Sequence, residues 1–178
     1  AQVGAGVGHQ RHQIAEIAGF AHRARDALIG EHACFNQPAA TEIAPSLQVI
    51  PLSGVVMVTT PQEVALLDVR KAIGMFQRLN VPILGIVENM SYFVAPDTGK
   101  RYAIFGEGGG QKLADEYGVP LLAQVPLDPA TRLAGDEGTP ITVRHPDSPQ
   151  AGAFRDLAVA VTRRLGELAP LLTLPKIG

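Results

Sequence analysis

The stretch GVVMVTTPQEVALLDVRKAIGMFQRLNVPILGIVENM, residues 54–90, decides the fold that the sequence predicts. It begins with a β-branched run over 54–60, which is typical of a strand buried on both faces. A helical pattern follows, and a second buried strand is predicted over 82–90. Two apolar strands joined by a helix of this length make a parallel βαβ unit with a right-handed crossover.

The helix of this unit has predicted ends at both sides. Thr60 is expected to cap its start and to form a capping box with Glu63. Its end is expected near Asn80, because the residue before Pro82 is restricted to extended backbone. The apolar residues at spacings of three and four define one face. They are Ala65, Val69, Ala72, Ile73 and Phe76.

The same order of strand and helix continues down the chain. A helix is predicted over 111–118, where it ends on a glycine, and a third strand over 119–127. Asp128 is expected to cap a short helix, and Ser148 to start a last helix with one apolar stripe. That stripe consists of Phe154, Leu157, Ala158, Val161 and Leu165. The sequence therefore predicts an α/β fold with a partial doubly wound parallel sheet.

Composition excludes several classes of function. The 178 residues carry a formal net charge of −2 and no block of basic residues, so no nucleic-acid partner is expected. No apolar run approaches the ~20 residues of a membrane span, so no membrane partner is expected either. The single cysteine, Cys34, fits a reducing compartment and predicts a cytoplasmic location.

In a doubly wound sheet, ligands bind beyond the carboxyl ends of the strands. These ends are predicted at 59–60, 88–90 and 126–128, which are therefore the candidate site. The glycines at 106–110 precede a helix, but they lack the G-x-x-x-x-G-K-[ST] spacing of a phosphate loop. We interpret them as allowing a tight loop and close packing. Glu88 has no partner nucleophile in the sequence and is interpreted as solvated or structural.

Four motifs, in this order, carry a resemblance to a known family: TTPQEVALLDVRK, GIVENMSYF, FGEGGG and VPLDP. From residue 48 to about residue 167, the sequence resembles the C-terminal half of the Mrp-type iron–sulfur cluster carriers. These are P-loop ATPases of the ParA/MinD branch. The resemblance implies an ATP-binding homodimer that holds an iron–sulfur cluster between its subunits and passes it to apoproteins.

The resemblance also predicts a boundary within the chain. Residues 1–47 contain four of the five histidines and no lysine, and we interpret them as an unmatched segment, disordered or misread in origin. Residues 48–178 are interpreted as the C-terminal part of a P-loop ATPase-like α/β domain. A family member would carry a lysine-bearing phosphate loop before the strand at 54, so the phosphate-binding half is predicted to be missing. Whether the chain is an enzyme stays open, because the family hydrolyses ATP but this sequence holds no Walker A motif.

The loop after the S-Y-F segment, which includes residues 95–98, departs from the family pattern as well. After S-Y-F, family members normally carry a C-x-x-C pair that contributes thiolates to the cluster. Here Ala95 and Thr98 occupy the two cysteine positions. Neither a methyl group nor a hydroxyl is a good ligand for iron, so no metal ligand is predicted.

The resemblance implies three residues that bind the nucleotide. Asn89 lies where this branch of ATPases recognises the adenine edge, and Pro126 and Asp128 line the same side. A side-chain amide can both donate to and accept from adenine. Two alternatives remain open, namely that Asn89 caps a strand end and that Asp128 only caps a helix. No catalytic residue is predicted.

Three functions are weighed on these grounds. The first is an ATP-dependent iron–sulfur cluster carrier or scaffold that transfers clusters to apoproteins, here without its phosphate loop and its cysteines. The second is a non-catalytic remnant or interaction module. A partitioning ATPase of the same branch ranks third, because FGEGGG and the S-Y-F segment indicate the carrier group.

Overall fold

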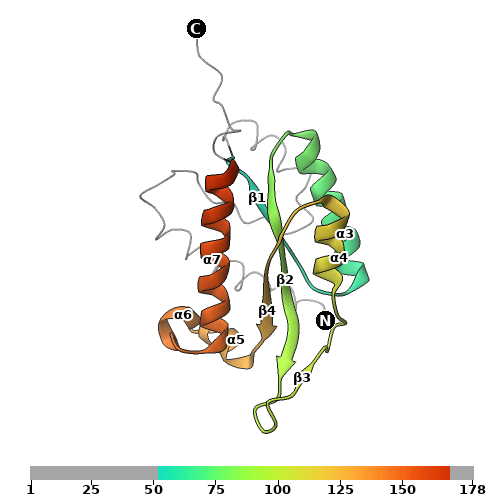
Figure 1. Cartoon of the computed structure of the whole chain (residues 1–178). Helices are drawn as coiled ribbons and strands as arrows, with labels where there is room; N and C mark the ends of the chain where they lie inside the picture. The colour runs from blue at the N-terminus through green and yellow to red at the C-terminus, as the bar shows by residue number, and fades with distance from the viewer. Residues whose placement is uncertain (1–51, 169–178) are drawn as a thin grey trace.

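The computed structural model describes residues 52–168, so the segment 1–47 and Cys34 lie outside the described residues. Strands and helices alternate along this part of the chain (Figure 1). In order they are β1 (Val55–Thr59), α3 (Glu63–Arg78), β2 (Ile83–Val94), β3 (Arg101–Tyr102), α4 (Gly109–Tyr117), β4 (Leu121–Leu127), α5 (Pro129–Asp136), α6 (Ile141–Arg144) and α7 (Pro149–Leu168).

The sheet is built around β2. This strand pairs in parallel with β1 on one side and with β4 on the other. The short strand β3 adds an antiparallel pair at the far end of β2, where Phe93 lies opposite Tyr102. The predicted α/β fold with a partial doubly wound sheet is confirmed, although β3 makes the sheet mixed rather than wholly parallel.

Helices cover both faces of the sheet and create two cores (Figure 1). Because side chains alternate along a strand, Ile86 of β2 faces one core and Val87 the other. The core under α3 and α4 consists of Met57, Leu66, Ile73, Phe76, Ile86, Leu113 and Ala114. The core under α5, α6 and α7 consists of Val87, Val125, Ala134, Ile141, Phe154 and Leu157.

Several predicted helix ends are confirmed. Asp128 caps α5 by accepting a hydrogen bond from the backbone N–H of Ala130 at 3.1 Å. The Ser148 hydroxyl accepts from the backbone N–H of Ala151 at 3.2 Å at the start of α7. Gly118 ends α4 in the left-handed conformation, with a φ of 64°. The one-turn helix α6 was not predicted.

The predicted capping box at the start of α3 does not form, so that prediction is wrong. The helix begins at Glu63 with Gln62 at the N-cap position, and none of the described side chains makes a cap bond there. The Thr60 hydroxyl instead donates to the side-chain oxygen of Gln62 at 3.1 Å. At the other end α3 stops at Arg78, two residues before Asn80, which has a left-handed φ of 54°.

The second strand is longer than predicted. It was expected to end at residue 90, but β2 continues to Val94. Its pairing with β4 shifts register between Asn89 and Phe93, and Met90 adopts a φ of 54° within this irregular stretch. A bulge of this kind redirects side chains, and it lies within the predicted site.

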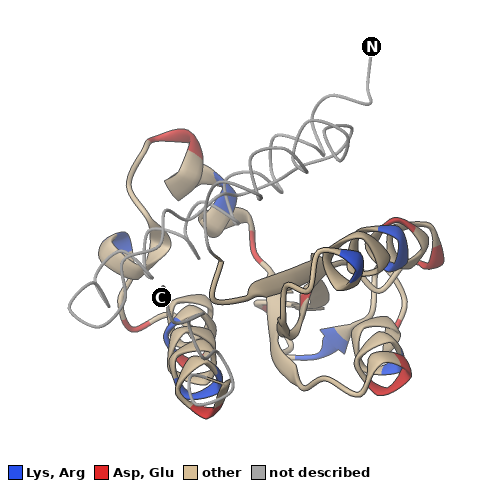
Figure 2. Ribbon diagram, turned by 90° about the horizontal axis from the view of Figure 1, so that it is seen from above, with Lys and Arg blue, Asp and Glu red and all other residues tan. Residues whose placement is uncertain are grey.

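Charged residues of both signs are interspersed along the helices, as Figure 2 shows. The described part of the chain therefore displays no basic stripe of the kind that binds nucleic acid. Within residues 52–168, no helix has both the length and the apolar character that crossing a bilayer requires.

Candidate functional site

The register of the sheet brings two of the three predicted clusters together. Thr59 of β1 lies opposite Glu88 of β2, and Glu88 lies opposite Gln124 of β4. Asn89 follows in the next row, opposite Val125. The third cluster, 126–128, continues from β4 along the same edge. The carboxyl ends of the parallel strands therefore meet as the sequence predicts.

Asn89 is a buried amide with one unused donor. Asn89 is only 2% exposed. Its Oδ1 accepts a hydrogen bond from the backbone N–H of Met90 at 3.0 Å. Its Nδ2 is buried and has no hydrogen-bond partner among the described residues. A buried donor without a partner costs about 1–3 kcal/mol, so this amide is suited to a ligand acceptor. The alternative that Asn89 caps a strand end is wrong, because β2 continues five residues further to Val94.

Glu88 is wholly buried and receives three hydrogen bonds. Its Oε1 accepts from the Ser91 hydroxyl at 2.5 Å and from the Gln124 side-chain amide at 3.0 Å. Its Oε2 accepts from the backbone N–H of Gly110 at 2.5 Å. At 0% exposure the carboxyl group is not solvated, so the structural part of the prediction is confirmed and the solvated part is wrong.

The glycine segment 106–110 packs against the ends of two strands. A Cβ on Gly109 would lie 2.4 Å from the carbonyl oxygen of Pro61, and a Cβ on Gly110 would lie 2.7 Å from Cβ of Glu88. Gly108 caps α4 in the left-handed conformation, with a φ of 73°. The close-packing interpretation is confirmed for Gly109 and Gly110, while Gly106 and Gly108, with φ of 95° and 73°, fit the tight-loop part of the prediction.

The same contacts bear on phosphate binding at the start of α4. A helix N-terminus attracts an anion through its free N–H groups and its dipole. Here the Glu88 carboxylate already receives the Gly110 N–H. The residues present do not fit a triphosphate at this position, since a second anion would meet the carboxylate.

Asp128 and Pro126 lie beside the Asn89 row but are engaged in local structure. Asp128 accepts from the Ala130 N–H with one carboxylate oxygen and from the Thr131 hydroxyl, at 3.3 Å, with the other. Helix capping is thereby confirmed for Asp128, while a nucleotide contact of Asp128 stays a prediction. Pro126 is buried at the end of β4, and its predicted nucleotide contact is likewise untested by the contacts seen here.

The loop in which the resemblance predicts the two cysteine positions is the tip of the β2–β3 hairpin. The backbone N–H of Ala95 donates to the carbonyl of Lys100 at 3.0 Å, and the N–H of Gly99 donates to the carbonyl of Ala95 at 2.8 Å. Ala95 is half-buried and Thr98 is exposed at this tip. Within the described residues, no group of three or more histidine, cysteine or acidic residues is placed to hold a metal ion.

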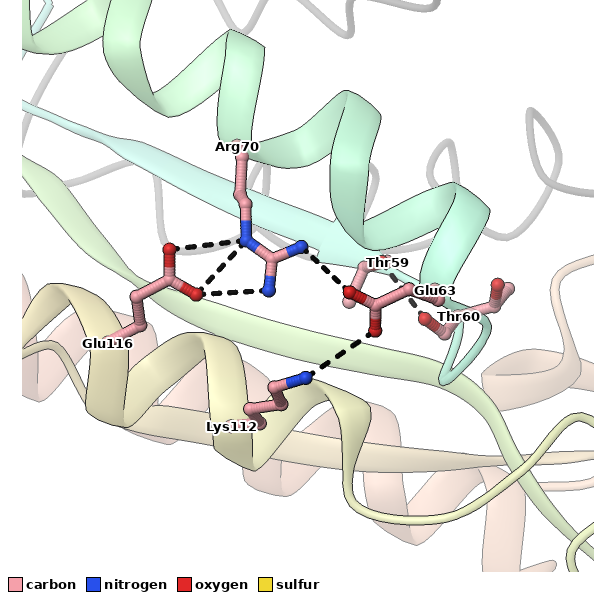
Figure 3. A network of polar contacts seen from close by, with 6 residues as sticks. All are labelled: Thr59, Thr60, Glu63, Arg70, Lys112 and Glu116. Carbon is pink, nitrogen blue, oxygen red and sulfur yellow. Dashed lines mark hydrogen bonds and ion pairs between the residues drawn. The ribbon is translucent and has the colours of Figure 1, made fainter.

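An ion-pair network that the sequence did not predict joins α3 to α4 (Figure 3). The Arg70 guanidinium lies between Glu116 and Glu63, with nitrogen–oxygen distances of 3.0 and 3.2 Å. Lys112 approaches Glu63 at 3.6 Å from α4. The hydrogen bond to Glu116 raises the pKa of Arg70 above its ordinary value, with a further contribution from Glu63. No sequence signal could find this network, because Arg70 and Glu116 lie 46 residues apart.

Together the three parallel strands, the helices on both faces and the polar residues at the carboxyl edge define part of a P-loop NTPase fold. The structure superposes on a nucleotide-binding protein from Archaeoglobus fulgidus, in complex with ADP, with a TM-score of 0.50 and 35% sequence identity. The superposition covers 61% of this chain and 43% of that protein.

The family described as the NUBPL iron-transfer P-loop NTPase, of ParA type, matches residues 40–162. The chain belongs to this family. The resemblance to the Mrp-type carriers of the ParA/MinD branch is thereby confirmed.

Named relatives point to the same group. The chain is 48% identical over 141 residues to an iron-sulfur cluster carrier protein of Deinococcus radiodurans. This match covers 79% of this chain and 39% of that protein. It is 50% identical over 117 residues to the carrier protein of Saccharolobus solfataricus, covering 65% of this chain and 40% of the relative. The chain therefore spans about two fifths of the length of these relatives.

Proposed function

We propose that the described domain supplies the adenine-binding edge of an ATP-dependent iron–sulfur cluster carrier, which works as a homodimer and passes clusters to apoproteins. The observation that supports this proposal is the buried Nδ2 of Asn89, which has no partner among residues 52–168. Membership of the iron-transfer family and the carrier names of the relatives agree with it.

The chemistry of adenine suits this amide. An asparagine amide recognises adenine by donating to a ring nitrogen while its oxygen accepts from the exocyclic amine. The Nδ2 of Asn89 is free to donate, and its Oδ1 keeps a second lone pair beside the bond from Met90. Guanine has an exocyclic oxygen, an acceptor, where adenine has its amine, so the same amide discriminates between the two bases.

The remaining parts of the carrier's chemistry are not assigned to residues of this chain. Phosphate binding and hydrolysis depend on a lysine-bearing loop and a bound magnesium ion, and these 178 residues hold no such motif. Iron ligation requires thiolates, and the hairpin offers Ala95 and Thr98 at the two cysteine positions. The proposal therefore assigns adenine recognition to this chain and assigns neither hydrolysis nor cluster ligation to its own residues.

Titration of the isotope-labelled chain with adenosine, followed by NMR, tests the proposal. We expect weak saturable binding that shifts the side-chain amide signals of Asn89, with a much smaller response to guanosine. An Asn89→Ala variant should lose the adenosine-dependent shifts of the neighbouring backbone amides, whereas Asn80→Gly, at an exposed asparagine with left-handed backbone after α3, should keep them. Equal responses to both nucleosides, or an unchanged response in Asn89→Ala, would overturn the proposal.

An interaction module is the second candidate function. Exposed apolar side chains occur on the β2–β3 hairpin and in the segment after it, where Val94, Tyr102 and Ile104 are 40%, 46% and 55% exposed. Exposed apolar side chains suit contact with another protein. The second function would be favoured if the chain binds no adenosine, and if it associates with another protein in a way that substitutions in this hairpin abolish.

A further inference from the structure

We propose that Glu88 is a positioning residue that aims the amide of Asn89 and couples it to the start of α4. This inference rests on the proposed adenine-binding function. It predicts that a nucleoside bound at Asn89 is sensed at Gly110, a residue 22 positions further along the chain.

One oxygen of Glu88 closes the bulge that carries Asn89. The Ser91 hydroxyl donates to Oε1 of Glu88 at 2.5 Å, so this bond spans Asn89 and Met90. Met90 is held in the left-handed region, with a φ of 54°, which costs a residue with a side chain about 1–2 kcal/mol. A bond across the bulge stabilises this unfavourable backbone conformation. It thereby fixes the direction of the side-chain amide of Asn89, which lies between Glu88 and Ser91.

The other oxygen of Glu88 holds the helix on the neighbouring layer. Its Oε2 accepts from the backbone N–H of Gly110 at 2.5 Å, in the first turn of α4. The carbon atoms of the two residues are close as well, because a Cβ built on Gly110 would lie 2.7 Å from Cβ of Glu88. The helix start cannot shift along the strand without breaking this bond or moving the carboxylate.

Burial makes the link rigid. Glu88 is 0% exposed, so water does not replace a donor that moves away, and a buried carboxylate that loses a partner is costly. Gln124 of β4 adds a third donor at 3.0 Å and ties the carboxylate to the neighbouring strand. A rearrangement of the bulge on ligand binding is therefore transmitted to α4 through this one side chain.

Amide hydrogen exchange on the isotope-labelled chain tests the link without any ligand. Replacing Glu88 by glutamine places an NH₂ group where one of the donors needs an acceptor. In Glu88→Gln we expect the Gly110 amide to exchange at least tenfold faster, the effect of losing a hydrogen bond to a charged group. The control, Glu107→Gln, makes the same chemical change at an exposed residue of the same loop and should leave this exchange unchanged.

A second variant separates the two ends of the link. Ser91→Ala removes the bond across the bulge but keeps the carboxylate on Gly110. We expect its Asn89 side-chain amide signals to move and its adenosine affinity to fall severalfold, with unchanged exchange at Gly110. Because Ser91→Ala removes only one hydroxyl, it keeps the test available if Glu88→Gln fails to fold.

The coupling itself is read from the titration with adenosine. In the unaltered chain, adenosine should shift both the Asn89 side-chain amide and the Gly110 backbone amide, and in Glu88→Gln the Gly110 shift should vanish even at saturating adenosine. Identical Gly110 exchange in Glu88→Gln and Glu107→Gln would overturn the positioning role. If the unaltered chain shows no response to adenosine at any residue, the adenine-binding proposal fails, while the exchange and the Asn89 signals still decide whether Glu88 links the two segments.

Discussion

Gly109 lies against Pro61 so closely that a Cβ built on the glycine would be 2.4 Å from the Pro61 carbonyl oxygen. Both residues are buried, Pro61 just after β1 and Gly109 at the first position of α4. A backbone carbonyl cannot swing aside as a long side chain can. The contact therefore requires glycine at this position if α4 is to begin over the end of β1.

Gly109→Ala should destabilise the domain by about 1–3 kcal/mol, the usual cost of forcing a methyl group into a packed contact. Gly74→Ala provides a control of opposite sign. A Cβ on Gly74 would meet nothing within 4 Å in the described part of the chain, and alanine in a helix interior is favoured over glycine by about 0.5–1 kcal/mol. Urea unfolding followed by circular dichroism measures both. A Gly109→Ala variant as stable as the unaltered chain would show that α4 is not held against Pro61.

Two neighbouring leucines of α3 should respond very differently to truncation. Leu66 is 1% exposed in the core under α3, whereas Leu67 is 51% exposed. We expect Leu66→Ala to lower the free energy of unfolding by about 2–5 kcal/mol and Leu67→Ala to change it by less than about 0.5 kcal/mol. Chemical denaturation of the two variants under the same conditions makes the comparison. Similar losses from both would mean that α3 presents a different face to the sheet.

Asp128 should act through its cap. Asp128→Ala removes the acceptor of the Ala130 N–H and should cost about 1 kcal/mol, while Asp128→Asn keeps a capping oxygen and should be nearly neutral. The thermal midpoint of each variant measures this difference. Unchanged adenosine affinity in Asp128→Asn would leave Asp128 with its capping role alone, and a clear loss would add the nucleotide contact that the family resemblance implies.

Local patterns in the sequence were sufficient for the βαβ unit and for the starts of α5 and α7. The β-branched run of β1 and the Asp128–Pro129 pair depend on residues within one turn or one strand of each other, and the structure confirms both. Such signals are local because capping and strand propensity are set by neighbouring backbone groups.

The features that sequence reasoning missed depend on contacts that residue spacing alone does not specify. Thr60 and Glu63 have the spacing of a capping box, yet Thr60 is buried just after β1 and bonds to Gln62 instead. The extension of β2 to Val94 is completed by pairing with β3, which begins seven residues after Val94. The role of Glu88 required Gly110, and a sequence pattern gives no indication of a partner 22 residues away.

The ion-pair network between α3 and α4 should contribute a small, salt-sensitive stabilisation. Replacing Arg70 by methionine removes its bonds to Glu116 and Glu63 together, and the resulting fall in the thermal midpoint should shrink as salt is added. Because the pKa of Arg70 is raised, the arginine's contribution is present below its ordinary pKa and is lost only as pH rises through the raised value. From about pH 7 to about pH 10 the effect of Arg70→Met should therefore be constant. Arg78→Met, at the exposed end of α3, is the matched control.

Introducing two cysteines at the hairpin tip should create an iron-binding site. Ala95 and Thr98 stand at the two positions that the family resemblance assigns to a C-x-x-C pair, and the turn between them is closed by the bond from Gly99 N–H to the Ala95 carbonyl at 2.8 Å. Two thiolates from each of two chains complete the four ligands of a four-iron cluster, so the doubly substituted chain should take up about two iron atoms per chain and dimerise as it does so.

The experiment is anaerobic reconstitution with iron and sulfide, followed by iron analysis, visible absorbance and gel filtration. A Cys34→Ser background removes the natural thiol from every variant compared. The single substitution Ala95→Cys in that background is the matched control, and it should bind less iron because a dimer then offers only two thiolates. Stoichiometric iron in the chain that keeps Ala95 and Thr98 would refute the assignment of cluster ligation to these two positions, since a methyl group and a hydroxyl cannot supply it.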